Sequence, residues 1–150
     1  MSLQVKVMDA MKEAMKSKDK VALESLRAIK SGLLLAQTES GASVELSVDA
    51  EIKLLQKLVK QRKESADIYL KQGRNDLAEP ELAQAVIIEK FLPEQMGIDE
   101  LKNVIADIIK STGASSIQDM GKVMGLASQK LAGKADGKSI STIVKELLGA

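Results

Sequence analysis

The sequence predicts an all-α protein with an N-terminal bundle of about four helices and a smaller C-terminal domain of three helices. Apolar residues recur at helical spacing along the chain, and no alternating strand pattern or fixed-period repeat is present. The hydrophobic fraction is 45%, yet the 150 residues include one Phe, one Tyr and no Trp. The core is therefore expected to consist of aliphatic side chains and the seven Met, a composition that favours helices over sheets.

The first two helices are expected over residues 3–17 and from Asp19 onward. In the first, Leu3, Val7, Met11 and Met15 share one face. Asp19 is expected to cap the second by accepting hydrogen bonds from free backbone N–H groups. The apolar positions of this second helix are Leu23, Leu26, Ile29, Leu33 and Leu34.

Two more helices are expected in the N-terminal half, after a loop over Glu39–Ser47 that contains Gly41. The third begins near Asp49 and ends at Gly73 in a left-handed conformation. Asn75 or Asp76 is expected to cap the fourth. We place Pro80 in its first turn, where a missing N–H is tolerated.

A break over Pro93–Ile98 predicts the domain boundary, giving domains 1–95 and 96–150. Asp99 is expected to cap the fifth helix, which closes near Gly113. Ser116 and Asp119 resemble a capping pair for a sixth helix that runs to about Leu131. Ser139 is expected to cap the last.

Composition excludes several classes of function. Without Cys or His, the chain has no thiolate nucleophile and lacks the commonest general base and metal ligand. It has 22 basic and 21 acidic residues, split 15 to 15 before Met96 and 7 to 6 from there on. Bulk charge therefore does not indicate nucleic-acid binding, and only a local patch would. We expect a soluble, cytoplasmic protein with no membrane span, no cofactor and no metal site.

The stretch Met120–Lys138 is the first candidate site. Gly137, Lys138 and Ser139 match the end of a phosphate-binding loop. That loop requires four residues between its glycines and a preceding strand, whereas Gly133 and Gly137 are separated by three residues and no strand is predicted. This excludes a nucleotide loop. In the structural interpretation, Gly121 and Gly125 let another helix approach, Gly133 ends their helix, and Asp136 with Gly137 forms a tight turn.

The lysines of this stretch leave a second interpretation open. Lys122, Lys130, Lys134 and Lys138 are accompanied only by Asp119 and Asp136. Such a basic surface, near helix N-terminal N–H groups, suits a phosphate backbone. The alternative is an ordinary charged surface with no partner, which is common.

Two further candidates lie in the N-terminal half. Lys53, Lys57 and Lys60 lie on one helix face, with Arg62 and Lys63 beside them. They suit an RNA backbone, or they form local ion pairs with Glu51, Glu64 and Asp67. The other candidate is catalysis by carboxylates, such as Glu79 with Glu81 or Glu89, for which no buried or metal-spaced pattern exists. We assign no catalytic residue.

Five ordered motifs carry a family resemblance that covers essentially the whole chain. They are Lys60–Ala66, Gly73–Glu79, Phe91–Gln95, Met120–Gly125 and Gly133–Gly137. Together they resemble the YqeY family, which is similar to the C-terminal tail of the GatB subunit of tRNA-dependent Asn/Gln amidotransferase. Pro80 departs from the family, which more usually has a charged helix former there.

The resemblance implies an all-helical protein connected to tRNA, because the tail domain of that amidotransferase reaches the bound tRNA while the chemistry occurs elsewhere. The enzyme's glutaminase and kinase-transamidase domains have no counterpart in this chain. The resemblance is thus to an accessory domain of a carbon–nitrogen ligase, without catalysis by this chain alone.

The sequence therefore leads to two main functional hypotheses; a third, an enzyme acting alone on glutamine or on tRNA-linked Glu or Asp, rests on the family resemblance only. The leading one is a non-catalytic tRNA-binding module that recognises shape and phosphates. Its principal contacts would be Lys122, Lys130, Lys134 and Lys138, with Gly121 and Gly125 allowing close approach. The alternative is a helical protein-interaction module that docks a translation or amidotransferase partner through an adaptable, Met-rich groove.

Overall fold

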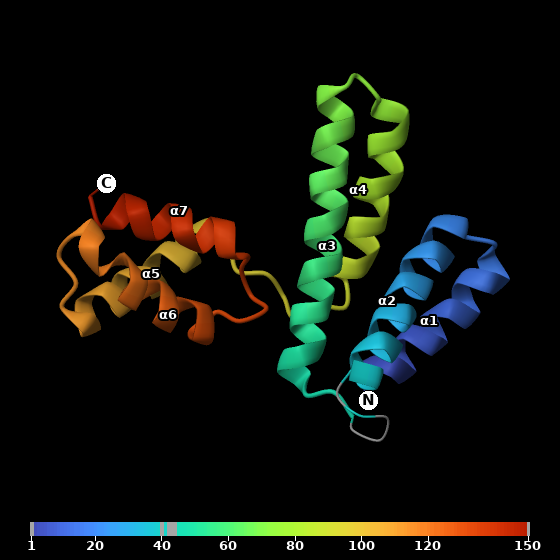
Figure 1. Ribbon diagram of the computed structural model, residues 1–150, viewed down its shortest axis with the longest axis horizontal. Coiled ribbons are helices and arrows are strands. Elements are labelled where there is room, and N and C mark those ends of the chain that lie inside the picture. Colours follow the sequence, from blue (N-terminus) through green and yellow to red (C-terminus); the bar gives the residue numbers. More distant parts are fainter. Residues whose placement is uncertain (1, 40, 42–44, 150) are drawn as a thin grey trace. The chain divides into compact units, whose positions relative to one another are not determined.

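The computed structural model describes residues 2–39, 41 and 45–149, and in this part of the chain it contains helices and no strand (Figure 1). The all-α prediction is confirmed. The chain divides into two compact units, Met1–Leu92 and Pro93–Ala150. The first unit contains α1 (Leu3–Ser17), α2 (Lys20–Glu39), α3 (Val48–Lys71) and α4 (Asn75–Glu89). The second contains α5 (Ile98–Thr112), a short 3₁₀ turn (Ile117–Asp119), α6 (Met120–Lys130) and α7 (Gly137–Leu147).

The first unit consists of two helical hairpins, α1 with α2 and α3 with α4 (Figure 1). Helix α2 joins them, because it packs against α1 on one side and against α3 and α4 on the other. The shared core is aliphatic, as expected from the composition. Its most deeply buried members are Val7, Leu26, Ile29, Leu55 and Ile88.

The expected helix ends in this unit are largely those observed. A carboxylate oxygen of Asp19 accepts a hydrogen bond from the Ala22 N–H at 3.0 Å, as predicted for a cap. Gly73 has φ +71°, so the left-handed residue after α3 is also confirmed. Of the predicted loop over Glu39–Ser47, residues 40 and 42–44 lie outside the described residues.

The width of the buried helix faces was predicted incorrectly in all four helices of this unit, since Leu70, Leu82 and Val86 of α3 and α4 are exposed as well as residues of α1 and α2. Met15 is 54% exposed and Leu34 is 64% exposed, although both were assigned to core faces. Ala14 is buried in place of Met15. The buried face of α2 also includes Ser25, whose hydroxyl donates to the Val21 carbonyl at 2.8 Å and is thereby satisfied within the helix.

The start of α4 differs from the prediction. Neither Asn75 nor Asp76 caps it, since the helix begins at Asn75 and no side chain caps it. The guanidinium of Arg74 instead donates to both carboxylate oxygens of Asp76, at 3.1 and 3.0 Å. Pro80 lies inside α4, beyond the first turn. There it removes one intrahelical hydrogen bond, which packing has to offset.

The second unit is a three-helix domain with its own core. Helices α5, α6 and α7 pack around the buried residues Leu101, Ile105, Val123 and Val144. Helix α5 begins after Gly97 without a side-chain cap, so the cap expected from Asp99 is wrong; Asp99 lies in the first turn. There its negative charge interacts favourably with the helix dipole, although its side chain does not cap the helix.

The segment that enters the second unit is fixed by hydrogen bonds. The Gln95 amide donates to the carbonyl oxygen of Gly133 at 2.7 Å and to that of Pro93 at 3.0 Å. The Met96 N–H donates to the Lys134 carbonyl at 2.9 Å. Residues 95 and 96 are therefore attached to the turn between α6 and α7.

Candidate nucleic-acid interface

The turn between α6 and α7 is built around one left-handed glycine. Gly133 is buried and has φ +77°, a conformation that residues with a Cβ rarely adopt. Asp136 caps α7, because its carboxylate accepts the Ser139 N–H at 2.8 Å. The predicted cap at Ser139 is therefore wrong, and Gly137 is the first residue of α7. The helix N-terminus nearest the lysines already holds a carboxylate.

The entry to α6 follows the predicted capping pair. Ser116 and Asp119 form a reciprocal capping box around the 3₁₀ turn. The Asp119 carboxylate accepts the N–H groups of Ser115 at 3.0 Å and Ser116 at 3.3 Å. These two bonds, aided by the charge of Lys122, lower the pKa of Asp119 below its usual value.

All four candidate lysines have exposed side chains. Lys122 and Lys130 are carried by α6, Lys134 by the turn and Lys138 by the first turn of α7. Within the described part of the chain, none of them forms an ion pair; in this unit an ion pair joins Lys102 to Glu146 at 3.3 Å. The carboxylates of Asp119 and Asp136 accept backbone N–H groups, and the charge of Lys122 also acts on Asp119. The four lysine side chains remain exposed to a partner.

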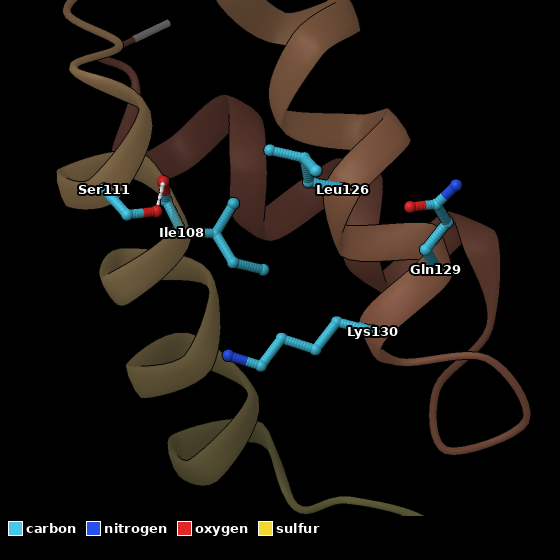
Figure 2. A pocket seen from close by; sticks show the side chains of 5 residues that line it. All are labelled: Ile108, Ser111, Leu126, Gln129 and Lys130. Carbon is cyan, nitrogen blue, oxygen red and sulfur yellow. Dashed lines mark hydrogen bonds between the residues drawn. The ribbon is translucent and has the colours of Figure 1, made fainter.

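Lys130 also borders an open hollow of about 400 Å³ between α5 and α6. Its other lining residues are Ile108, Ser111, Leu126 and Gln129. Figure 2 shows Leu126 and Lys130 extending from α6 toward α5, whereas the Gln129 amide points away. The Ser111 hydroxyl is occupied, since it donates to the Ile108 carbonyl at 2.9 Å. The aliphatic stem of Lys130 therefore covers apolar surface while its ammonium group stays accessible.

The two glycines of α6 make no close helix contact among the described residues of the second unit. Gly121 and Gly125 are exposed, and a Cβ added at either would meet no atom within 4 Å. The expectation that another helix approaches them closely is therefore wrong for α5 and α7. Close approach occurs instead at Gly32 of α2, where a Cβ would lie 2.9 Å from Leu54 Cδ1 of α3. Sequence analysis missed Gly32 because a single glycine within a helix gives no signal of its neighbour.

The basic stripe of α3 is exposed and partly paired. Lys60 lies 3.9 Å from Glu64, whereas Lys53 and Lys57 form no ion pair with a described residue. The two neighbouring cations have structural contacts with α4. Arg62 donates to the Gln84 side chain at 3.0 Å, and Lys63 lies 2.7 Å from Glu89. Lys53, Lys57 and Lys60 belong to the first unit, and the other four lysines to the second.

The carboxylates singled out in α4 form no catalytic arrangement. Glu89 is paired with Lys63, and Glu79 lies on the exposed surface of α4. Among the described residues, no group of three or more Asp and Glu is placed to hold a metal ion. No helix in the described part of the chain is long and apolar enough to cross a membrane.

Fold and surface together define an all-helical protein of two compact units with unpaired lysines on both. The chain matches the family described as Yqey-like protein over residues 4–148. It therefore belongs to the YqeY family.

Two relatives illustrate how far similarity extends. One, from Pyrenophora tritici-repentis, is 28% identical over 144 residues, which covers 93% of this chain and 77% of that protein. The other, from Clavispora lusitaniae, is 35% identical over 82 residues, covering 55% of this chain and 46% of that protein. Both are named "Altered inheritance of mitochondria protein 41, mitochondrial".

Proposed function

We propose that this YqeY-family protein is a non-catalytic tRNA-binding module related to tRNA-dependent amidotransferases. The observation that carries the proposal is the set of four exposed lysines on α6, the following turn and α7, none paired with a described acidic residue. Unpaired cations on an ordered surface attract a phosphate backbone and release its counterions. Lys53, Lys57 and Lys60 of α3 would add contacts from the first unit.

Contact with phosphates is proposed to come from lysine side chains and not from helix N-termini. The carboxylate of Asp136 already accepts a backbone N–H at the start of α7. The carboxylate of Asp119, which immediately precedes α6, accepts the N–H groups of Ser115 and Ser116. A second anion at those positions would be repelled. Lysines without aromatic neighbours favour recognition of RNA shape and charge over base sequence.

Gly121 and Gly125 are a second argument that RNA binds at the surface of α6. Each costs about 1 kcal/mol of helix stability relative to Ala, and neither makes room for another part of the described chain. In the proposed complex, the missing Cβ atoms let an RNA backbone lie close to α6.

The test is a titration of labelled bulk tRNA with the full chain at several salt concentrations. The double variant Lys122→Ala/Lys134→Ala is expected to bind about threefold to tenfold more weakly at low salt, as for exposed charges. Its plot of log affinity against log salt should lose about one unit of slope per lysine removed.

A matched double variant controls for loss of charge. Lys110→Ala/Lys145→Ala removes two exposed lysines of the same unit that form no ion pair with described residues. It is expected to retain most of the affinity and slope. Absence of tRNA binding at low salt, or an equal loss in both double variants, would contradict the proposed interface.

The proposal includes no catalysis by this chain alone, because no nucleophile, general base or metal site is assigned. An assay for ammonia release from glutamine, run beside an active glutaminase, tests this directly. Release above background would contradict a purely binding role. A cytoplasmic location is likewise proposed from the sequence, while the relatives compared are named as mitochondrial proteins.

A further inference from the structure

One flank of the α1/α2 hairpin carries exposed apolar side chains. On α1, Met8 is 43% and Met15 is 54% exposed; on α2, Leu34 is 64% exposed. Gln4, Met8 and Met15 follow one another at helical spacing and so lie along one line of α1. Leu34, Lys30 and Arg27 follow the facing line of α2.

Part of these two lines borders a hollow. Gln4 and Val7 of α1 meet Lys30, Leu33, Leu34 and Gln37 of α2 around a volume of about 50 Å³. Val7 and Leu33 are buried, while Leu34 and Lys30 are exposed. We call this hollow, together with Met8, Met15 and Arg27 further along the same two lines, the α1/α2 groove.

The charges of the α1/α2 groove have one sign. Arg27 and Lys30 are exposed, and neither forms an ion pair with a described residue. Three acidic residues on the same helices are engaged elsewhere, and Glu39, the last residue of α2, does not lie on the line of Arg27, Lys30 and Leu34. Asp9 and Glu13 pair with Lys12 and Lys16 along α1, and Glu24 accepts a hydrogen bond from Gln84 of α4. The groove is therefore apolar with a purely cationic edge.

We infer that the α1/α2 groove binds an acidic amphipathic helix of a partner protein. The apolar stripe of that helix would lie between the two methionines and Leu34, with its Asp or Glu residues beside Arg27 and Lys30. Methionine side chains adapt to differently shaped apolar groups. A concave surface between two helices, with only two cations, suits a helix better than a flat anionic bilayer. It also has no aromatic side chain on which an RNA base stacks.

The test selects ligands from a displayed library of helical peptides about four turns long, using the immobilised full chain. Enriched peptides are expected to be acidic and amphipathic. Added to isotopically labelled protein, they should shift the amide resonances of Gln4, Met8 and Leu34. Reversing both charges, with Arg27→Glu/Lys30→Glu, should weaken their binding about threefold to tenfold, as for charges at the rim of an interface.

Two adjacent leucines provide a matched control. Leu34 and Leu35 are 64% and 62% exposed, yet only Leu34 lines the hollow. Leu34→Asp is expected to weaken peptide binding by at least about tenfold, because it removes an apolar contact and places a carboxylate beside the acidic residues of the peptide. Leu35→Asp should leave binding almost unchanged. Circular dichroism of both variants checks that the helices remain folded.

Several outcomes would overturn the inference. They are a library that enriches no peptide, enriched peptides without an acidic excess, or equal effects of Leu34→Asp and Leu35→Asp. Displacement of the peptide by bulk tRNA or by vesicles of anionic lipid, with the same resonances shifted, would assign the groove to those ligands. The Lys122→Ala/Lys134→Ala variant should bind the peptides normally, so failure of tRNA binding and failure of peptide binding are separate results.

Discussion

The carboxylate of Asp119 accepts two backbone N–H groups just before α6. Its pKa is lowered mainly by the N–H groups of Ser115 and then Ser116, with a smaller contribution from the charge of Lys122. A carboxyl with a lowered folded-state pKa stabilises the fold when it is ionised. This contribution is complete well above the usual value of 3.8 and is lost as the pH falls from there through the lower folded-state pKa.

Asp119→Asn should therefore destabilise the second unit at neutral pH, because the neutral amide accepts the N–H groups of Ser115 and Ser116 more weakly than the carboxylate does. The difference from the unmodified protein should shrink as the pH falls below 3.8, the usual value of the carboxyl, because Asp119 then becomes protonated. Urea unfolding at a series of pH values measures this. Asp107→Asn, at an exposed position of α5, is the control, and a difference that grows toward acid pH would contradict the assignment.

Single residues show where sequence patterns suffice and where they fail. The capping pair Ser116 with Asp119 and the left-handed Gly113, with φ +69°, were predictable because their causes are local. The exposure of Met15 and Leu34 was not. Helical spacing identifies the direction of a buried face, but its width depends on which helices pack against it.

Helix α6 contains two exposed glycines, and no contact among the described residues explains why a side chain is absent at these positions. Because Gly121 and Gly125 face open space, Gly121→Ala and Gly125→Ala should each stabilise the second unit by about 1 kcal/mol. If RNA lies close to α6, the same substitutions should weaken tRNA binding. Thermal unfolding and tRNA titration of each variant measure the two effects separately.

Gly32 supplies the comparison for these glycines. At this position a Cβ would lie 2.9 Å from Leu54 Cδ1, so Gly32→Ala has to displace Leu54 and should gain less stability than either substitution in α6. Unchanged tRNA affinity in both α6 variants would remove the glycines from the proposed interface. Loss of stability there would show that α6 has a contact outside the described residues.

At the level of elements, local chemistry predicted that helices form but not always how they begin. The predicted helices match α1 to α7, because long amphipathic periods dominate each segment. The starts of α5 and α7 were misassigned, since Asp99 and Ser139 are cap-forming residue types placed one or more positions inside the helix. Where two cap-forming residues lie within a few positions of each other, as Asp136 and Ser139 do, the incoming backbone decides which of them caps the helix.

At the scale of the whole molecule, the described residues form two aliphatic cores, one in each unit. One extends from Leu3 to Ile88 and the other from Leu101 to Leu148. A substitution in one core is therefore expected to act mainly on its own unit. Ile105→Ala should lower the stability of the second unit by about 2–5 kcal/mol.

The single tyrosine makes this separation measurable. Tyr69 lies in α3 of the first unit, so its fluorescence follows that unit, while circular dichroism follows the helices of both. In urea, Ile105→Ala should shift the second unit's part of the circular-dichroism transition and leave the tyrosine transition in place. Ile29→Ala, in the first core, should do the reverse. A single transition, shifted equally in both signals, would contradict independent cores.

The candidate site was predictable from sequence only as a set of residue types. Lysines are recognisable in the sequence. Whether they form ion pairs depends on the directions of nearby carboxylates such as those of Asp119 and Asp136, which accept backbone N–H groups. The α1/α2 groove escaped sequence analysis, because it arises where the flanks of two hairpin helices meet. Sequence periodicity shows which residues share a face of one helix, but not which residues of two different helices lie beside each other.

The hydrogen bonds from Gln95 and Met96 to the turn at Gly133 and Lys134 bear on the entropy of association. A lysine in a disordered tail has to immobilise both backbone and side chain when it binds, at about 1–2 kcal/mol for the backbone of each residue. The backbone of Lys134 is already held, and Lys122, Lys130 and Lys138 lie in helices. Only side-chain rotamers would remain to be ordered, so each phosphate contact in the proposed complex would retain more of its electrostatic free energy.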